Sequence, residues 1–171
     1  MQTDLLIIGA GPFGLSLAAY AKSLGVDFLV AGRAMEFWKK NMPEGMYLRS
    51  ASDWSLDPTD RFSIMNYLEA LGKTTKDVEP LSLEFYLQYA QWFQDGAGIE
   101  TISEYVTRLD QKENGFLATF EDGKVVEAKN VAVAIPEHFI PAFKPAKEFV
   151  QEIKSSPNIK EAPEVKDDSD E

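Results

Sequence analysis

An apolar segment that runs directly into three spaced glycines restricts the fold of this chain more than any other feature. The segment Asp4–Ile8 reads DLLII, and GAGPFG follows it at once. A G-x-G-x-x-G arrangement between a strand and a helix is typical of a dinucleotide-binding turn. The first glycine permits the tight turn, the second lets the backbone approach a pyrophosphate, and the third lets the helix lie against the strand. Gly9, Gly11 and Gly14 are therefore predicted to bind a pyrophosphate at a helix start.

The residues after this turn complete a strand–helix–strand unit. Residues 12–23 predict a helix rich in small residues that is ended by Gly25, and residues 27–30 predict a second strand. Such a unit is typical of a parallel sheet covered by helices. Pro12 and Phe13 lie inside the glycine turn, and we expect both to line the same phosphate site.

Irregular and helical patterns fill the middle of the chain. Residues 33–62 contain several aromatic residues without a regular period, and we expect them to be irregular. Ser63 and Ser82 are suited to cap two helices, because a serine side chain can accept a hydrogen bond from a free amide at a helix start. The second helix has apolar residues at helical spacing and ends near residues 95–98. Residues 99–103 then suit a strand.

A change of period predicts a β-meander in the second half. Residues 105–112, 116–120 and 124–128 predict three antiparallel strands, because Asn-Gly and Asp-Gly pairs between them are strong hairpin signals. Residues 131–135 are wholly apolar and predict a further short strand, buried in the parallel sheet. The expected fold class is α/β, with a Rossmann-like parallel sheet, helices on its faces and a three-stranded antiparallel meander.

The composition restricts the chemistry and the partners. The 171 residues contain no cysteine and one histidine, which excludes disulfides, cysteine-based metal or redox sites and a histidine metal cluster. His138 is interpreted as an exposed residue rather than a general base. A formal net charge of -11 argues against a nucleic-acid partner. With no long apolar run and no basic leader before the first strand, we expect a cytoplasmic protein that does not bind membranes.

Three stretches of the sequence carry a family resemblance. The glycine turn has a proline after its second glycine, residues 32–50 contain a tryptophan and a Pro-x-Gly, and residues 131–135 follow the predicted meander. Together they resemble the first, FAD-binding half of two-dinucleotide flavoproteins, and they are most similar to flavin-dependent monooxygenases, including the N-hydroxylating branch. The resemblance covers residues 3–145 and implies an FAD-dependent oxidoreductase. We expect a charged tail at 146–171, disordered over residues 155–171.

The resemblance also suggests further FAD contacts, each with a plainer alternative. Arg33 would reach the adenosine or a phosphate, or would be a solvated arginine. Trp38 would lie near the flavin or its ribityl chain, or would be a core aromatic residue. Arg49 and Ser50 would lie where the loop returns toward the flavin ring, or would be surface residues. Val106 would offer its backbone to the adenine, or would be an ordinary strand residue.

The sequence departs from the family pattern in several places. Many members have an acid at the end of the second strand for the ribose hydroxyls, whereas this chain has Gly32 and Arg33 there, with Glu36 as a possible substitute. Ala134-Ile135-Pro136 replaces Ala-Thr-Gly. No second G-x-G-x-x-G is present for NADPH, and the returning strand and helix of the family are also missing.

These departures predict an incomplete FAD domain whose parallel sheet has one bare edge. The favoured function is an FAD-binding oxidoreductase fragment that would need its missing half to be active. One alternative is an NADP-binding module, since a missing acid together with Arg33 fits recognition of a 2′-phosphate. The other is a non-catalytic subunit that assembles with a partner chain or as a homodimer. No catalytic residue and no metal ligand is assigned.

Overall fold

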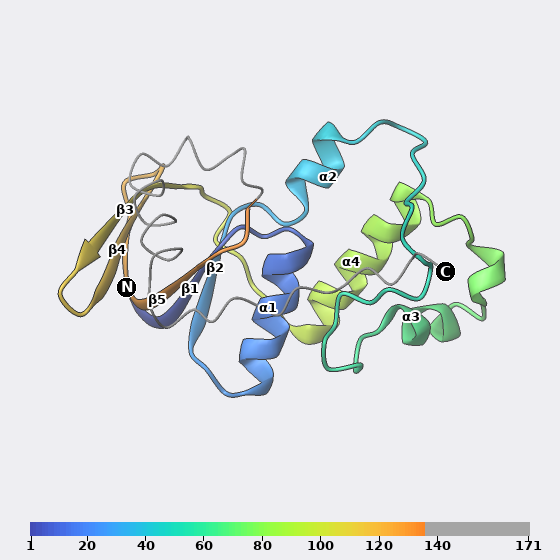
Figure 1. Cartoon of the computed structure of the whole chain (residues 1–171), viewed down its shortest axis with the longest axis horizontal. Coiled ribbons are helices and arrows are strands. Elements are labelled where there is room, and N and C mark those ends of the chain that lie inside the picture. The colour runs from blue at the N-terminus through green and yellow to red at the C-terminus, as the bar shows by residue number, and fades with distance from the viewer. Residues whose placement is uncertain (136–171) are drawn as a thin grey trace, which may run out of the picture.

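The computed structural model of the chain describes residues 1–135 (Figure 1). The strands lie at one end of this region, α3 and α4 lie toward the other, and α1 lies between them. The predicted domain limit at residue 145, the predicted tail and His138 lie outside the described residues.

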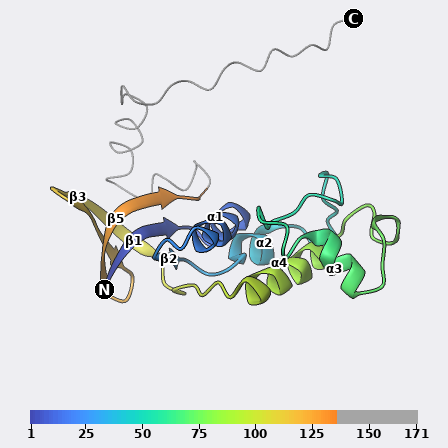
Figure 2. The ribbon, with the colours of Figure 1, turned by 90° about the horizontal axis from the view of Figure 1, so that it is seen from below.

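One five-stranded mixed sheet combines the parallel unit and the meander, in the order β2-β1-β5-β4-β3. β1 pairs in parallel with both β2 and β5, while β4 pairs antiparallel with β5 and with β3. The carboxyl ends of β1 and β5 point toward α1 (Figure 2). The α/β fold class with a meander is therefore confirmed. The strands are β1 (Gln2–Ile8), β2 (Phe28–Ala31), β3 (Val106–Lys112), β4 (Gly115–Phe120) and β5 (Val125–Val133).

The prediction of two separate strands at 124–128 and 131–135 is wrong, because one continuous strand, β5, runs from Val125 to Val133. The polar residues between the two predicted ranges, Lys129 and Asn130, lie in β5 beside the start of β1. Lys129 forms an ion pair with Asp4, and the Asn130 amide donates to the Asp4 carbonyl at 3.1 Å. These exposed contacts explain why polar residues occur inside a strand.

The second half of β5 is only half-buried, so the predicted full burial of residues 131–135 is also wrong. β4 pairs with β5 no further than Ala128, whereas β1 pairs with it up to Val133. Within residues 1–135, the side of β5 that faces away from β1 is therefore unpaired beyond Ala128. The bare edge of the whole sheet stays a prediction. At the opposite edge of the sheet, residues 99–103 form only an isolated bridge between Ile102 and Ala31, not a full strand.

The helices follow the predicted caps except in one place. The Ser63 and Ser82 hydroxyls accept hydrogen bonds from the amides of Asn66 and Phe85, as predicted. The expectation of an irregular segment over 33–62 is wrong at α2, which begins after Met35 in a left-handed conformation with φ 56°. A methionine in this role is not a helix-start signal. The helices are α1 (Pro12–Ser23), α2 (Glu36–Asn41), α3 (Ile64–Ala70) and α4 (Leu83–Ala97), with a 3₁₀ turn at Thr75–Asp77.

Alternate residues of β1 serve two cores on the two faces of the sheet. Ile7 packs with residues of α1 and α4, whereas Leu6 and Ile8 pack with the meander. This alternation follows from the two-residue period of a strand and explains why β1 is a continuous apolar run. Both faces of β1 are covered, so its carboxyl end and the glycine turn after it are held firmly. No helix within residues 1–135 is long and apolar enough to cross a membrane.

Candidate dinucleotide-binding site

Two of the three turn glycines are required by packing inside the protein. A Cβ on Gly14 would lie 1.8 Å from the Gly9 carbonyl oxygen, so only glycine lets α1 approach the turn this closely. Gly9 has φ +115°, and a Cβ there would lie 2.5 Å from the Ala134 carbonyl oxygen. These contacts agree with the turn and close-packing roles predicted from the sequence.

The middle glycine is different, because space rather than protein lies next to it. Gly11 has an extended backbone with φ -82°, and a Cβ there would meet no atom within 4 Å. No backbone hydrogen bond within residues 1–135 uses the amides of Gly11, Phe13 or Gly14. The positive end of the α1 dipole lies at the same place. The turn therefore offers open donors and room for an anionic group, which fits a pyrophosphate.

The two residues between these glycines have different surroundings. Pro12 occupies the first turn of α1, where its missing amide costs no hydrogen bond. The Phe13 side chain is 83% exposed. Their predicted contacts with the cofactor stay predictions, and the amide of Phe13 is the part of that residue that fits the phosphate role.

The tertiary structure brings the end of β2 to the glycine turn. A Cβ on Gly32 would lie 3.4 Å from the amide nitrogen of Ala10, and φ at Gly32 is +122°. The Met35 amide donates to the Ala10 carbonyl at 2.9 Å. Arg33 lies between these two residues and therefore stands beside the turn. Its contact with the adenosine or a phosphate stays a prediction.

Arg33 is a paired arginine rather than a freely solvated one. Its Nε donates to the Ser103 carbonyl at 3.0 Å, and its Nη2 donates to Glu121 Oε1 at 2.8 Å. Its guanidinium carbon lies 4.6 Å from the centre of the Tyr105 ring. We call Arg33, Ser103, Tyr105 and Glu121 the Arg33 cluster. Sequence reasoning missed the other three members, because only the pairing of the strands brings Ser103, Tyr105 and Glu121 to the end of β2.

Glu36, the possible substitute for the acid that binds the ribose hydroxyls, already lies next to two positively charged side chains. It pairs with Lys40, and one carboxylate oxygen lies 3.7 Å from Arg33 Nη1. The hydrogen bond from Lys40 is the main reason that the pKa of Glu36 lies below its usual value. The carboxylate is therefore ionised at neutral pH and already faces two positive groups.

Trp38 has the surroundings of a core aromatic residue. It is half-buried, and its ring lies 5.1 Å from that of Tyr86 on α4, with an interplanar angle of 54°. This tilted contact joins α2 to the helical end of the molecule. The structure shows the core contact, whereas contact of Trp38 with a flavin stays a prediction.

The remaining predicted residues lie in three different surroundings. Arg49 is exposed and Ser50 is half-buried in the loop between α2 and α3. No hydrogen bond or ion pair within the described part of the chain joins either residue to the glycine turn. Val106 is buried in the meander core at the start of β3, directly after Tyr105 of the Arg33 cluster. Their contacts with a cofactor stay predictions.

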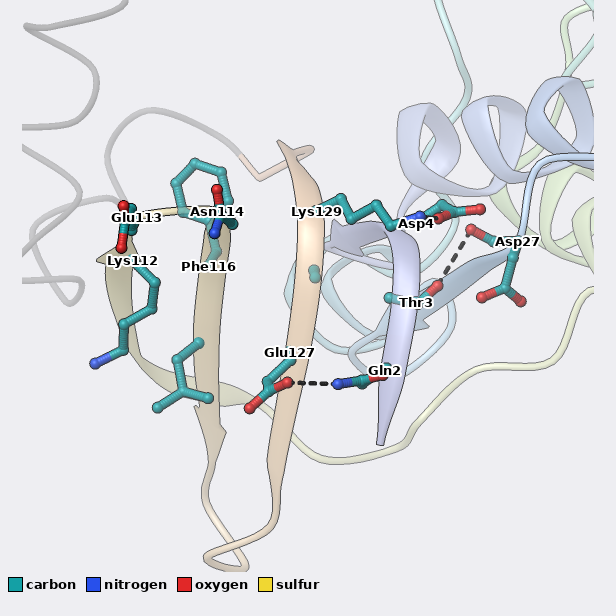
Figure 3. A pocket seen from close by; sticks show the side chains of 13 residues that line it. Gln2, Thr3, Asp4, Asp27, Lys112, Glu113, Asn114, Phe116, Glu127 and Lys129 are labelled. Carbon is teal, nitrogen blue, oxygen red and sulfur yellow. Dashed lines mark hydrogen bonds and ion pairs between the residues drawn. The ribbon is translucent and has the colours of Figure 1, made fainter.

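A pocket lies at the end of β1 opposite the glycine turn and is not part of this site. It has a volume of about 650 Å³ and lies between the start of β1 and the tip of the β3–β4 hairpin (Figure 3). Two carboxylates that line the pocket already have partners from its own lining: Glu127 accepts from Gln2 at 2.7 Å, and Asp4 pairs with Lys129. Among residues 1–135, no group of histidine and acidic residues could hold a metal ion.

Solved structures with similar folds are flavin-dependent proteins and related reductases. Bacillithiol disulfide reductase from Staphylococcus aureus is 25% identical, with a TM-score of 0.62 over 80% of this chain and 39% of its own. Flavin-containing monooxygenase from Stenotrophomonas maltophilia is 19% identical, with a TM-score of 0.62 over 78% and 38% of the two chains. A lysine monooxygenase from Nocardia farcinica is 19% identical, with a TM-score of 0.61 over 78% and 44%.

These similarities cover only part of each neighbour, so this chain spans about two fifths of the length of the solved proteins it resembles. No curated protein matches the sequence. The family described as L-lysine 6-monooxygenase/L-ornithine 5-monooxygenase matches residues 1–169, nearly the whole chain. The resemblance to flavin-dependent monooxygenases of the N-hydroxylating branch is thereby confirmed, and the chain belongs to the L-lysine 6-monooxygenase/L-ornithine 5-monooxygenase family.

Proposed function

We propose that this chain is the FAD-binding part of a flavin-dependent monooxygenase, and that its glycine turn holds the FAD pyrophosphate. The observation that carries the proposal is the open space next to Gly11, beside the amides of Gly11, Phe13 and Gly14, which have no hydrogen-bond partner within residues 1–135. Amide donors that bind no other group within residues 1–135 are available to phosphate oxygens without breaking a bond in that part of the chain.

The residues of this chain would bind and orient the cofactor. Bound flavin supplies the redox and oxygen chemistry of such enzymes. The turn between β1 and α1 would hold the pyrophosphate, and the end of β2 would lie beside the adenosine. The 171 residues contain one G-x-G-x-x-G, so an NADPH site of the same type would have to lie outside them. We therefore assign cofactor binding to these residues and propose that hydroxylation needs further protein outside them.

The unpaired side of β5 supports the idea of a further segment at this sheet. Parallel sheets are normally covered, and an exposed strand edge presents free amide and carbonyl groups. Within residues 1–135, the side of β5 away from β1 has no partner beyond Ala128. A further strand from outside residues 1–135 would complete the sheet next to the proposed flavin site.

An NADP-binding module is less well supported by the contacts of Arg33. Recognition of a 2′-phosphate commonly uses an arginine near the end of the second strand. Here that arginine already pairs with Glu121 and lies close to Glu36. Competitive titration of FAD and NADPH decides between the two cofactors, and tighter binding of NADPH would overturn the FAD assignment.

The test is titration of the wild type and of Gly11→Ala with FAD, with quenching of the flavin fluorescence as the measured signal. The added methyl group would enter the open space but touch no protein atom. We expect at least a tenfold loss of affinity, because a lost charge-assisted hydrogen bond is worth about 1.5–3 kcal/mol.

The control variant is Ser16→Ala, which changes α1 one turn later and leaves the glycine turn intact. It should bind FAD as the wild type does. A wild-type protein without FAD affinity would overturn the proposed function. Equal FAD affinity in Gly11→Ala and the wild type would show that the pyrophosphate does not lie at Gly11.

A further inference from the structure

The end of β2 holds an arginine whose charge is already balanced within the protein. Arg33 Nη2 bonds to Glu121 at 2.8 Å, and Arg33 Nη1 lies 3.7 Å from Glu36, which also pairs with Lys40. These two cations and two carboxylates sum to zero charge. This group of four side chains beside the glycine turn therefore carries no net positive charge, although the sequence places an arginine there.

The contacts of Arg33 occupy one edge and one face of its guanidinium. Nε and Nη2 form the edge that bonds to the Ser103 carbonyl and to Glu121. One face of the group lies against the Tyr105 ring, at 4.6 Å from its centre. The Glu121 amide donates to the Tyr105 carbonyl at 2.9 Å, which fixes the carboxylate-bearing residue to the same segment. The cluster is thus held by backbone as well as side-chain contacts.

In dinucleotide sites, the ribose 2′ position faces the end of the second strand. An acid there accepts hydrogen bonds from the ribose hydroxyls, and an arginine there accommodates a 2′-phosphate. An acid at position 32 would be strained, since φ is +122° and Ala10 lies close by. Discrimination between a ribose 2′-hydroxyl and a 2′-phosphate must therefore come from residues other than position 32. The Arg33 cluster lies at this end of β2.

We propose that Glu121 makes the site select dinucleotides without a 2′-phosphate, by occupying the guanidinium edge that such a phosphate would need. A 2′-phosphate would have to displace Glu121 from Arg33 or bind at Nη1 beside the Glu36 carboxylate. Either position brings like charges together, which disfavours the phosphorylated ligand. This inference rests on the proposed function, because it concerns the adenosine end of the same site.

The experiment compares ADP with ADP that carries a 2′-phosphate, each measured by its displacement of FAD. The wild type should bind ADP more tightly. Glu121→Gln should shift the ratio of the two affinities toward the 2′-phosphorylated ligand by about fivefold, the size of one exposed ion pair. The double variant Glu121→Gln/Arg33→Gln should lose this shift, because the gain depends on the guanidinium that Glu121 releases.

Asp122→Asn is the matched control, since it removes the same charge from the neighbouring residue of the same turn, where Asp122 pairs with Lys124 and not with Arg33. Glu121→Ala is a second test variant in case Glu121→Gln folds poorly, and thermal melting checks the fold of each. A wild type that prefers the 2′-phosphorylated ligand overturns the inference, as does an equal shift in Asp122→Asn and Glu121→Gln. A wild type that binds neither FAD nor ADP overturns the proposed function instead.

Discussion

Substitution of Gly14 by alanine should damage the fold, whereas the same substitution at Gly11 should damage only ligand binding. The new Cβ at position 14 would lie 1.8 Å from the Gly9 carbonyl oxygen, whereas real Cβ contacts are at least 3.0 Å. The two segments would have to separate by more than about 1 Å. Both clashing groups belong to backbone or are fixed to it, so no side-chain rotation can relieve the contact.

The energetic cost follows from what α1 contributes to the core. Leu15 and Ala18 are fully buried on α1 and pack in the same cluster as Ile7 of β1. Moving α1 away from β1 would loosen this packing, so we expect a loss of about 3 kcal/mol, at the upper end for overpacked sites. For a chain of 171 residues this lowers Tm by about 6–12 °C. Gly11→Ala should cost less than about 1 kcal/mol, the size of a changed helix cap.

Far-UV circular dichroism during thermal and urea unfolding measures both variants against the wild type without any ligand. The reasoning is wrong if Gly14→Ala melts within about 2 °C of the wild type, since the clash would then be relieved at little cost. It is also wrong if Gly11→Ala loses as much stability as Gly14→Ala. Equal losses would mean that the middle glycine, too, is required by packing rather than by a ligand.

Two further predictions concern the segment between α2 and α3, including its contact with α4. Tyr89→Phe should lose about 2–3 kcal/mol of unfolding free energy in urea, because the Tyr89 hydroxyl accepts from the buried Leu56 amide at 2.9 Å and donates to the Phe62 carbonyl at 3.1 Å. The control is Tyr86→Phe, three residues earlier on α4, which should be nearly neutral. Equal losses in the two variants would contradict the role of the Tyr89 hydroxyl. Burial of Asp57 raises its pKa, but hydrogen bonds from the Thr59 and Phe62 amides outweigh burial and leave the pKa below its usual value. Its contribution to stability is therefore complete above the unfolded pKa of about 4 and is lost as the pH falls through the lower folded value. Asp57→Asn should be less stable at pH 7 and should show a weaker loss of stability between pH 5 and pH 2; an unchanged pH dependence would refute this assignment.

Local sequence signals account for much of the fold. The strand before the glycines and the small-residue helix after them are confirmed at β1 and α1 because each signal describes contacts between near neighbours. The serine caps of α3 and α4 are confirmed for the same reason. Where such a signal is absent, prediction failed: α2 begins after a left-handed methionine, and β5 continues through two polar residues.

The glycine turn illustrates what one segment can determine by itself. A strand, three spaced glycines and a helix start are all that the sequence needs to specify a bend suited to an anion, because the donors that it presents are backbone amides. The Arg33 cluster required the tertiary structure, because Arg33 meets Tyr105 and Glu121 only when the meander pairs in its observed register. Backbone conformation is set by neighbouring residues, whereas the partner of a long charged side chain is set by which distant strands are brought beside it.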